Sequence, residues 1–92
     1  MIEKFLKKSE FSSMEDFREN LEYIVPDDFN FVYDVMDEWA RVAPDKLALM
    51  WTNDQGEEKR FSFSDMKRET DKVASYLLSL GIGKNDMVML VL

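Results

Sequence analysis

The first amphipathic pattern along the chain falls between Ser12 and Pro26. Its apolar residues recur at spacings of three and four, as on one face of a helix: Met14, Phe17, Leu21 and Ile24. Glu15 follows Ser12 by three positions, the spacing of a capping box. Proline disfavours helical geometry in the residue before it, so the pattern predicts a short helix that ends in a turn at residues 25–28.

A second helix is predicted to begin at Asn30, a favourable N-cap residue, and to end at Pro44. Its apolar stripe comprises Val32, Val35, Met36, Trp39, Ala40 and Ala43, and its polar face comprises Asp34, Asp37, Glu38 and Arg41. Asp37 precedes Arg41 by four positions, the favoured order for an ion pair on a helix surface.

Two strands joined by a tight loop are predicted next. Residues 47–52 are apolar at nearly every position, which is typical of a strand covered on both faces. Residues 59–63 alternate between polar and apolar, as in a strand with one face in water. The loop at 53–57 is rich in turn-forming residues, and Gly56 can adopt the positive φ that such a hairpin needs.

A third helix is predicted from an N-cap at Ser64 to Gly81, which is placed to end it. The expected buried stripe is Met66, Thr70, Val73, Ala74, Leu77 and Leu80, and the water-facing positions are Lys67, Arg68, Asp71, Lys72, Ser75 and Ser79.

The last pattern is the apolar run Met87–Leu92, which follows a turn at residues 83–86 and predicts a strand in the middle of a covered sheet. The chain supplies too few elements to cover such a strand, so we expect it to be the truncated start of a longer protein. The predicted fold class is α/β, or α+β for the isolated piece, in the order helix, helix, hairpin, helix, strand.

Composition supports a folded domain, since 46% of the residues are hydrophobic and 34% are charged. The net charge of −7 disfavours nucleic acid as a partner, because no broad cationic surface is available. Lys4, Lys7 and Lys8 are interpreted as a solvated terminal arm rather than as a membrane anchor. No signal peptide or membrane span is recognisable, so we expect no membrane partner and a cytoplasmic location.

Several kinds of catalytic site are excluded within this chain. It has no cysteine and no histidine, which removes disulfides, zinc sites built from these ligands, and Ser-His-Asp triads. The Gly81–Lys84 segment lacks the first glycine and the Ser or Thr of a phosphate loop, so we interpret it as the end of a helix. A calcium loop starting at Asp28 would place Tyr33 at its glycine position and Trp39 at its glutamate position, and is rejected. Asp34, Asp37 and Glu38 are interpreted as solvated charges.

The aromatic residues Phe29, Phe31, Tyr33 and Trp39 lack the interleaved basic residues of a nucleic-acid platform. We expect core packing for Phe31 and Trp39. Phe61 and Phe63 are expected on one face of the second strand, packed against the third helix.

Four segments in order resemble the start of the AMP-forming acyl-CoA synthetases, in particular the medium-chain and acetyl-CoA synthetase-like branch. They are the Asn-Phe-x-x-Asp-Val opening, a Pro-Asp-Lys-x-Ala-Leu segment leading into a strand, a Phe-Ser-Phe-x-Asp segment leading into a long helix, and Leu-Gly-Ile-x-Lys-x-Asp-x-Val. In this chain they occupy Asn30–Val35, Pro44–Leu49, Phe61–Met66 and Leu80–Val88. The resemblance implies an adenylate-forming enzyme, with residues 1–28 as an N-terminal arm and 29–92 as the start of its large AMP-binding domain.

The family resemblance also implies a two-step reaction in the longer enzyme. A carboxylate attacks ATP, with magnesium, to give an acyl-adenylate, and coenzyme A then displaces AMP to form a thioester. The corresponding motifs would all follow Leu92, so no catalytic, cofactor-binding or metal-binding residue is assigned here and the piece alone is expected to be inactive. The expected partner is the remainder of the enzyme, with self-association of the isolated piece through Met87–Leu92. The alternative is a stand-alone acidic interaction module that docks through this exposed strand.

Overall fold

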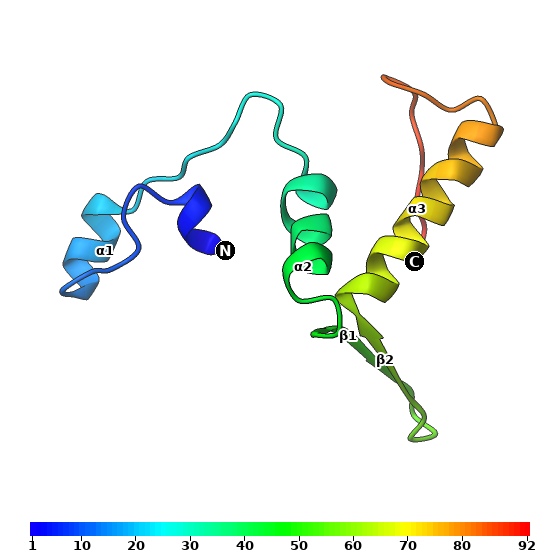
Figure 1. Cartoon of the computed structure of the whole chain (residues 1–92), viewed down its shortest axis with the longest axis horizontal. Helices are drawn as coiled ribbons and strands as arrows, with labels where there is room; N and C mark the ends of the chain where they lie inside the picture. The colour runs from blue at the N-terminus through cyan, green and yellow to red at the C-terminus, as the bar shows by residue number, and fades with distance from the viewer.

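The computed structural model describes every residue, Met1–Leu92, and shows an open arrangement of helices around one hairpin (Figure 1). The elements in order are the 3₁₀ helix η1 (Ile2–Phe5), α1 (Met14–Asn20), the π-helix η2 (Val32–Met36), α2 (Asp37–Val42), β1 (Leu47–Thr52), β2 (Glu58–Ser62) and α3 (Phe63–Ser79). The fold is mixed α/β, as predicted from the sequence. Helix, helix, hairpin and helix follow in the predicted order.

Residues 1–28, which we call the N-terminal arm, close on themselves. The N–H of Lys7 donates to the carbonyl of Glu22, and the N–H of Ile24 donates to the carbonyl of Phe5. An isolated antiparallel bridge joins Leu6 to Tyr23 between these bonds. The arm is therefore a small loop that starts at η1, passes through α1 and returns beside its own beginning (Figure 1).

The predicted first helix forms, but it is shorter and is capped one residue later than expected. Ser13, not Ser12, accepts the N–H of Asp16 at 3.0 Å, so the capping box predicted between Ser12 and Glu15 is wrong. The start of the helix lies one residue later because the Asp16 carboxylate, rather than that of Glu15, accepts the N–H of Ser12, at 2.9 Å. The helix ends at Asn20, because the following residues leave it to pair with the start of the chain.

The second helix begins as a π-helical turn and continues as α2. Asn30 has the expected capping role, since its side-chain oxygen accepts the N–H groups of Val32 and Tyr33 at 3.0 and 3.2 Å. The helix ends at Val42, and Pro44 follows it as predicted.

The hairpin forms as predicted, with β1 antiparallel to β2 from Leu47↔Ser62 to Thr52↔Glu58. The register shifts between Leu47 and Leu49, which leaves Ala48 as the extra residue of a bulge. Gly56 in the connecting loop has a φ of 79°, the left-handed conformation predicted for it.

Helix α3 begins earlier than predicted. Ser62, not Ser64, accepts the N–H of Asp65 at 3.2 Å, and the Asp65 carboxylate accepts the N–H of Ser62 at 3.0 Å. This reciprocal capping box makes Phe63 the first residue of the helix rather than the last residue of the strand. At the other end, Gly81 has a φ of 80° and terminates the helix as predicted.

Trp39 lies at the junction of α2, the hairpin and α3. Its indole stacks on the ring of Phe63, with centroids 5.5 Å apart, and Lys46 Nζ lies 3.9 Å from the indole centroid. The backbone also joins these elements, since the N–H of Phe63 donates to the carbonyl of Lys46 at 3.0 Å. Trp39 therefore packs against another helix, but it is only partly buried, and the expectation that it lies in a core is wrong for this structure.

No residue of the chain is fully buried. Phe31, predicted to be a core residue, is 59% exposed, and most positions of β1 are exposed instead of covered on both faces. Phe63 packs on α2, and the prediction that it shares a strand face with Phe61 is wrong. These apolar stripes have no second layer of elements to cover them.

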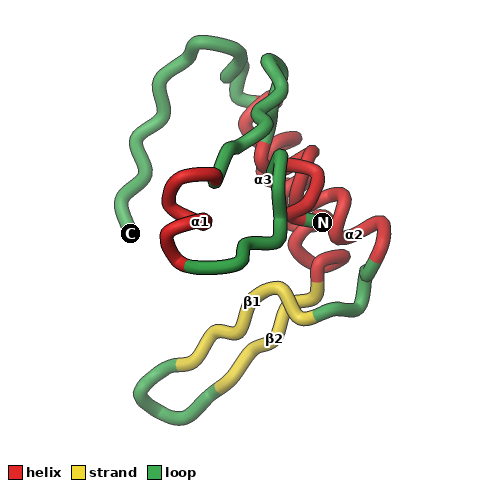
Figure 2. Tube along the Cα trace, turned by 90° about the vertical axis from the view of Figure 1, so that its left-hand side faces the viewer, coloured by secondary structure: helices red, strands yellow, loops and turns green.

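Residues Met87–Leu92, here called the apolar tail, are extended but pair with no strand, so the prediction of a strand is wrong for this structure. The only sheet contains β1 and β2. In Figure 2 a loop follows α3 and leads into the tail, which stands clear of that helix. A strand requires a neighbour for its N–H and C=O groups, and the tail has none here.

The Ser62 cap can be tested with Ser62→Ala. We expect the variant to destabilise α3 by about 1 kcal/mol, because the N–H of Asp65 loses its acceptor. The measurement is the helical content of residues 63–79, from far-ultraviolet circular dichroism and Cα chemical shifts. Ser75→Ala is the matched control: Ser75 lies exposed within α3, and alanine there is expected to be neutral or slightly stabilising. Equal losses in the two variants would contradict the capping role.

Candidate functional site

The Gly81–Lys84 segment is a helix terminus and does not form an anion-binding loop. The N–H of Gly83 donates to the carboxylate of Asp86 at 2.7 Å, and the N–H of Asp86 donates to the carbonyl of Gly83. The chain's own carboxylate thus occupies the position where a phosphate oxygen would accept from this loop. The structure agrees with the interpretation of the segment as the end of a helix.

The acidic residues of the second helix, expected to be solvated charges, each have a partner in the structure, and the side chains of Asp37 and Glu38 are mostly covered. Asp34 accepts the N–H of Asn30 at 2.7 Å, and Asp37 pairs with Lys67 of α3 at 3.3 Å. The predicted pair of Asp37 with Arg41 is wrong: Arg41 makes two hydrogen bonds to Glu38, at 2.7 and 2.8 Å. Asp37 instead faces α3, so it joins two helices.

Glu38 is the most strongly perturbed member of this group. Its carboxylate accepts from Arg41 and, across 34 residues of sequence, from Lys4 at 2.8 Å. The Arg41 guanidinium first, and the Lys4 ammonium second, lower the pKa of Glu38 to about 2. Charge-assisted hydrogen bonds stabilise the ionised carboxylate, so the perturbation marks an ion-pair cluster. It is the opposite of the raised pKa that a general acid requires.

A hollow of about 650 Å³ lies along the outer side of α3. It is lined by Ser64, Lys67, Arg68, Asp71, Lys72 and Ser75, all from this one helix. Its three cations are neutralised locally: Lys67 pairs with Asp71, Arg68 with Asp65 and Lys72 with Glu69, at 2.6 to 3.0 Å. Asp71 first, and Asp37 second, raise the pKa of Lys67. An anionic ligand would have to displace these partners.

A smaller hollow of about 320 Å³ lies where the hairpin meets α3. It contains Asp45 and Asp65, with Leu47, Arg60 and Ser62. The N–H of Ser62 first, and Arg68 second, lower the pKa of Asp65, which is committed to the capping box. No group of three or more Asp, Glu, His or Cys residues has an arrangement that could hold a metal ion.

The aromatic residues do not form a continuous stacking platform. Phe29 contacts Phe5 edge-on, with centroids 5.6 Å apart, while Trp39 is held between Phe63 and Lys46. Phe31 and Tyr33 are exposed, at 59% and 67%, and take part in no ring pair. Phe29 and Trp39 therefore join one part of the chain to another, whereas Phe31 and Tyr33 do not.

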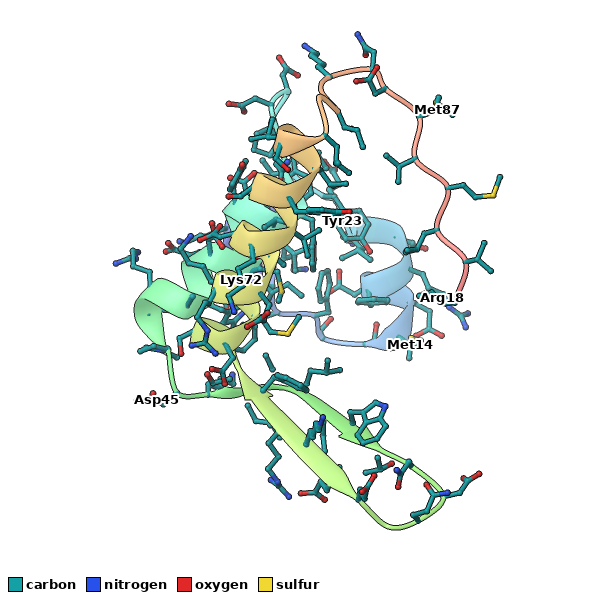
Figure 3. All side chains as sticks on the ribbon, turned by 90° about the vertical axis from the view of Figure 1, so that its right-hand side faces the viewer. Met14, Arg18, Tyr23, Asp45, Lys72 and Met87 are labelled. Atoms are coloured by element: carbon teal, nitrogen blue, oxygen red, sulfur yellow. The ribbon has the colours of Figure 1, made fainter.

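The most prominent functional feature is an uncovered apolar surface. In the apolar tail, Met87 is 96% exposed and Met89 is 89% exposed. Figure 3 shows Met87 at the start of the tail, well apart from Lys72 on α3. Other large apolar residues are about half exposed or more on β1, on α3 and at the C-cap of α3: Leu47, Leu49, Met50, Val73, Tyr76, Leu78 and Leu80. A monomeric soluble protein seldom exposes so many apolar side chains, so this surface is typical of an interface.

Several contacts were missed by reasoning from sequence, and two of them differ in whether the sequence carries a signal for them. The capping box of α3 has a recognisable signal, since Ser62 precedes Asp65 by three positions. The Lys4–Glu38 pair has no such signal, because its residues lie on elements far apart in sequence.

The class of protein follows from comparison with known families. A family model described as AMP-binding enzyme matches residues 36–92, more than half of the chain. This chain belongs to that family. The matched part begins in the second helix, includes the hairpin and α3, and extends through the apolar tail.

Individual relatives are acyl-CoA synthetases. The chain is 36% identical over 75 residues to the mitochondrial acyl-coenzyme A synthetase ACSM5 of Homo sapiens, which covers 75% of this chain and 13% of the relative. It is 33% identical over 88 residues to human mitochondrial ACSM3, and this alignment covers 89% of the chain and 15% of the relative. It is 36% identical over 61 residues to a propionate–CoA ligase of Salmonella typhimurium, and this alignment covers 65% of the chain and 10% of the relative. The chain thus aligns with 10% to 15% of the lengths of these relatives.

None of the helices combines the length and the apolar character needed to cross a bilayer.

The ion-pair cluster predicts a specific pH dependence. Folding lowers the pKa of Glu38 from 4.5 to about 2, so its contribution to stability is complete above pH 4.5 and is lost as the pH falls towards 2. A carboxyl carbon titration by NMR is expected to give a midpoint near pH 2 for Glu38. Arg41→Gln should raise that midpoint more than Lys4→Gln, because Arg41 is the larger cause. Lys84→Gln, which removes a distant cation, should leave it in place; a wild-type midpoint near 4.5 would contradict the cluster.

Proposed function

We propose that this chain forms the N-terminal part of an acyl-CoA synthetase, in which residues 1–28 are an arm and residues 29–92 begin the large AMP-binding domain. The observation that carries the proposal is the family match over residues 36–92. The uncovered apolar surface supports it, because the hairpin, α3 and the tail carry apolar side chains suited to contacts with further elements.

In this proposal the whole enzyme activates a short- or medium-chain carboxylic acid. The acid's carboxylate attacks ATP and forms an acyl-adenylate with release of pyrophosphate; the coenzyme A thiol then displaces AMP to give the thioester. The names of the relatives, acyl-coenzyme A synthetase and propionate–CoA ligase, support this class of reaction.

The residues of this chain act as scaffold in the proposed enzyme. Several of its carboxylates are held in ion pairs and caps, and no group of three or more metal-ligating side chains is arranged to hold a metal ion. We therefore assign the ATP, Mg²⁺ and coenzyme A sites to other parts of the enzyme, and expect the 92 residues alone to be inactive. The cytoplasmic location stays a prediction, while the two human relatives are mitochondrial by name.

The activity is tested by expressing the longer open reading frame that contains these residues. Pyrophosphate release is expected only when ATP and a carboxylic acid are both present, and thioester formation only when coenzyme A is added. Reactions without acid, and the 92-residue chain alone, are the controls. Absence of acid-dependent pyrophosphate release with acetate, propionate, hexanoate and benzoate would contradict the proposal.

A stand-alone interaction module is the second candidate, and the exposure of the apolar tail favours it. An extended, unpaired and uncharged segment can bind by adding a strand to a partner. A reading frame that continues past Leu92 into further helices and strands would support the enzyme, whereas a stop codon directly after Leu92 would support the module.

For the isolated chain we also propose self-association through the apolar tail. Light scattering after gel filtration is expected to show oligomers whose share rises with protein concentration, because pairing tails satisfies their backbone groups and covers their side chains. Leu90→Lys should shift the chain towards monomer, since each tail then carries a charge into the pairing. Ser75→Lys, with the same change outside the tail, is the control. A monomer at all concentrations would contradict the idea.

A further inference from the structure

The N-terminal arm has its own internal contacts. Lys8 pairs with Asp16 at 2.9 Å, Lys7 pairs with Glu22, and the ring of Phe11 packs edge-on against Phe17 with centroids 5.2 Å apart. Together with the backbone bonds between its two ends, these contacts join the beginning of the arm to its end. The arm is therefore suited to move as one piece.

Few contacts join the arm to the rest of the chain. Lys4 Nζ lies 2.8 Å from Glu38 Oε1, and the ring of Phe5 packs edge-on against Phe29. Both contacts come from η1, and α1 packs extensively on no other element. Figure 1 shows the arm beside α2, connected to it by a long arching segment.

The connecting segment contains no helix or strand between Val25 and Asn30. Val25 is 67% exposed, and one turn bond, from the N–H of Phe29 to the carbonyl of Pro26, is the only backbone bond recorded within the segment. Pro26 restricts its own φ, but the exposed Asp27 and Asp28 have no such restriction. Rotation about these residues displaces the arm without breaking its internal contacts.

We propose that residues 1–24 of the N-terminal arm act as a reversible strap, which docks on and leaves the second helix as a unit, hinged at residues 25–28 and latched by the Lys4–Glu38 ion pair. Docking places Phe5 against Phe29 and adds a second cation to the Glu38–Arg41 pair. Release of the strap uncovers the Phe29 ring and this face of the second helix. The inference is independent of the proposed enzymatic function.

The latch is weak enough to open. Lys4 is 58% exposed, so its ion pair with Glu38 shifts the equilibrium between docked and released strap only a few-fold. The edge-on contact of Phe5 with Phe29 has an effect of similar size, so both states are populated. Loss of the ion pair alone should lower the ratio of docked to released strap about two- to five-fold.

Spin-label distances in the 92-residue chain test the strap directly. The chain has no cysteine, so the double variant Ser9→Cys/Gln55→Cys carries one label on the arm and one at the hairpin loop. Double electron–electron resonance is expected to show a narrow distance distribution for the docked strap and a broader one for the released strap. Lys4→Glu should transfer population from the first to the second, and Lys4→Glu/Glu38→Lys, in which opposite charges face each other again, should recover much of the docked state.

The control is Lys84→Glu, which changes the net charge equally but lies beyond α3, away from the arm. Circular dichroism of each sample verifies that α3 is retained. A distribution unchanged by Lys4→Glu would overturn the latch, as would an equal response to Lys84→Glu. If the wild-type chain shows only one broad distance distribution, the docked state does not exist. If it shows only one narrow distribution, and this distribution persists in Phe5→Ala/Lys4→Glu, the strap does not leave the second helix.

Discussion

The arrangement of residues 37–79 depends on the packing of Trp39 between Phe63 and Lys46. The Phe63 ring interacts with the Trp39 indole by dispersion and by the contact of the two ring quadrupoles. The Lys46 ammonium adds a cation–π attraction to the same indole. Trp39 belongs to α2, Lys46 directly precedes β1 and Phe63 begins α3, so one cluster connects α2, the hairpin and α3. The Asp37–Lys67 pair then adds a polar contact between the two helices.

Beyond this cluster the chain has apolar stripes without a common interior. The hairpin and α3 present large side chains that remain about half exposed, and the side chains of the tail are more than half exposed, Met87 and Met89 almost completely. The family match includes all of these segments. Their apolar character therefore belongs to a part of the chain that matches the AMP-binding enzyme family.

Local signals predicted the elements well. Asn30, Gly56 and Gly81 act within a few residues of themselves, so their roles could be inferred from the sequence alone. Caps were less certain where two serines lie close together: Ser13 and Ser62 act, whereas Ser12 and Ser64 had been expected to do so. Contacts between distant elements gave no signal, as for Lys4 with Glu38, and the tail was predicted as a strand although strand formation depends on a partner.

The contacts around Trp39 also bear on the order of events during synthesis. Its partners Lys46 and Phe63 follow it closely along the chain, and contacts of short sequence separation close quickly. The cluster can therefore assemble on the ribosome soon after α3 leaves the exit tunnel. The apolar tail emerges afterwards, with its side chains exposed and with no strand in this part of the chain to pair with, so its burial has to wait for a later contact.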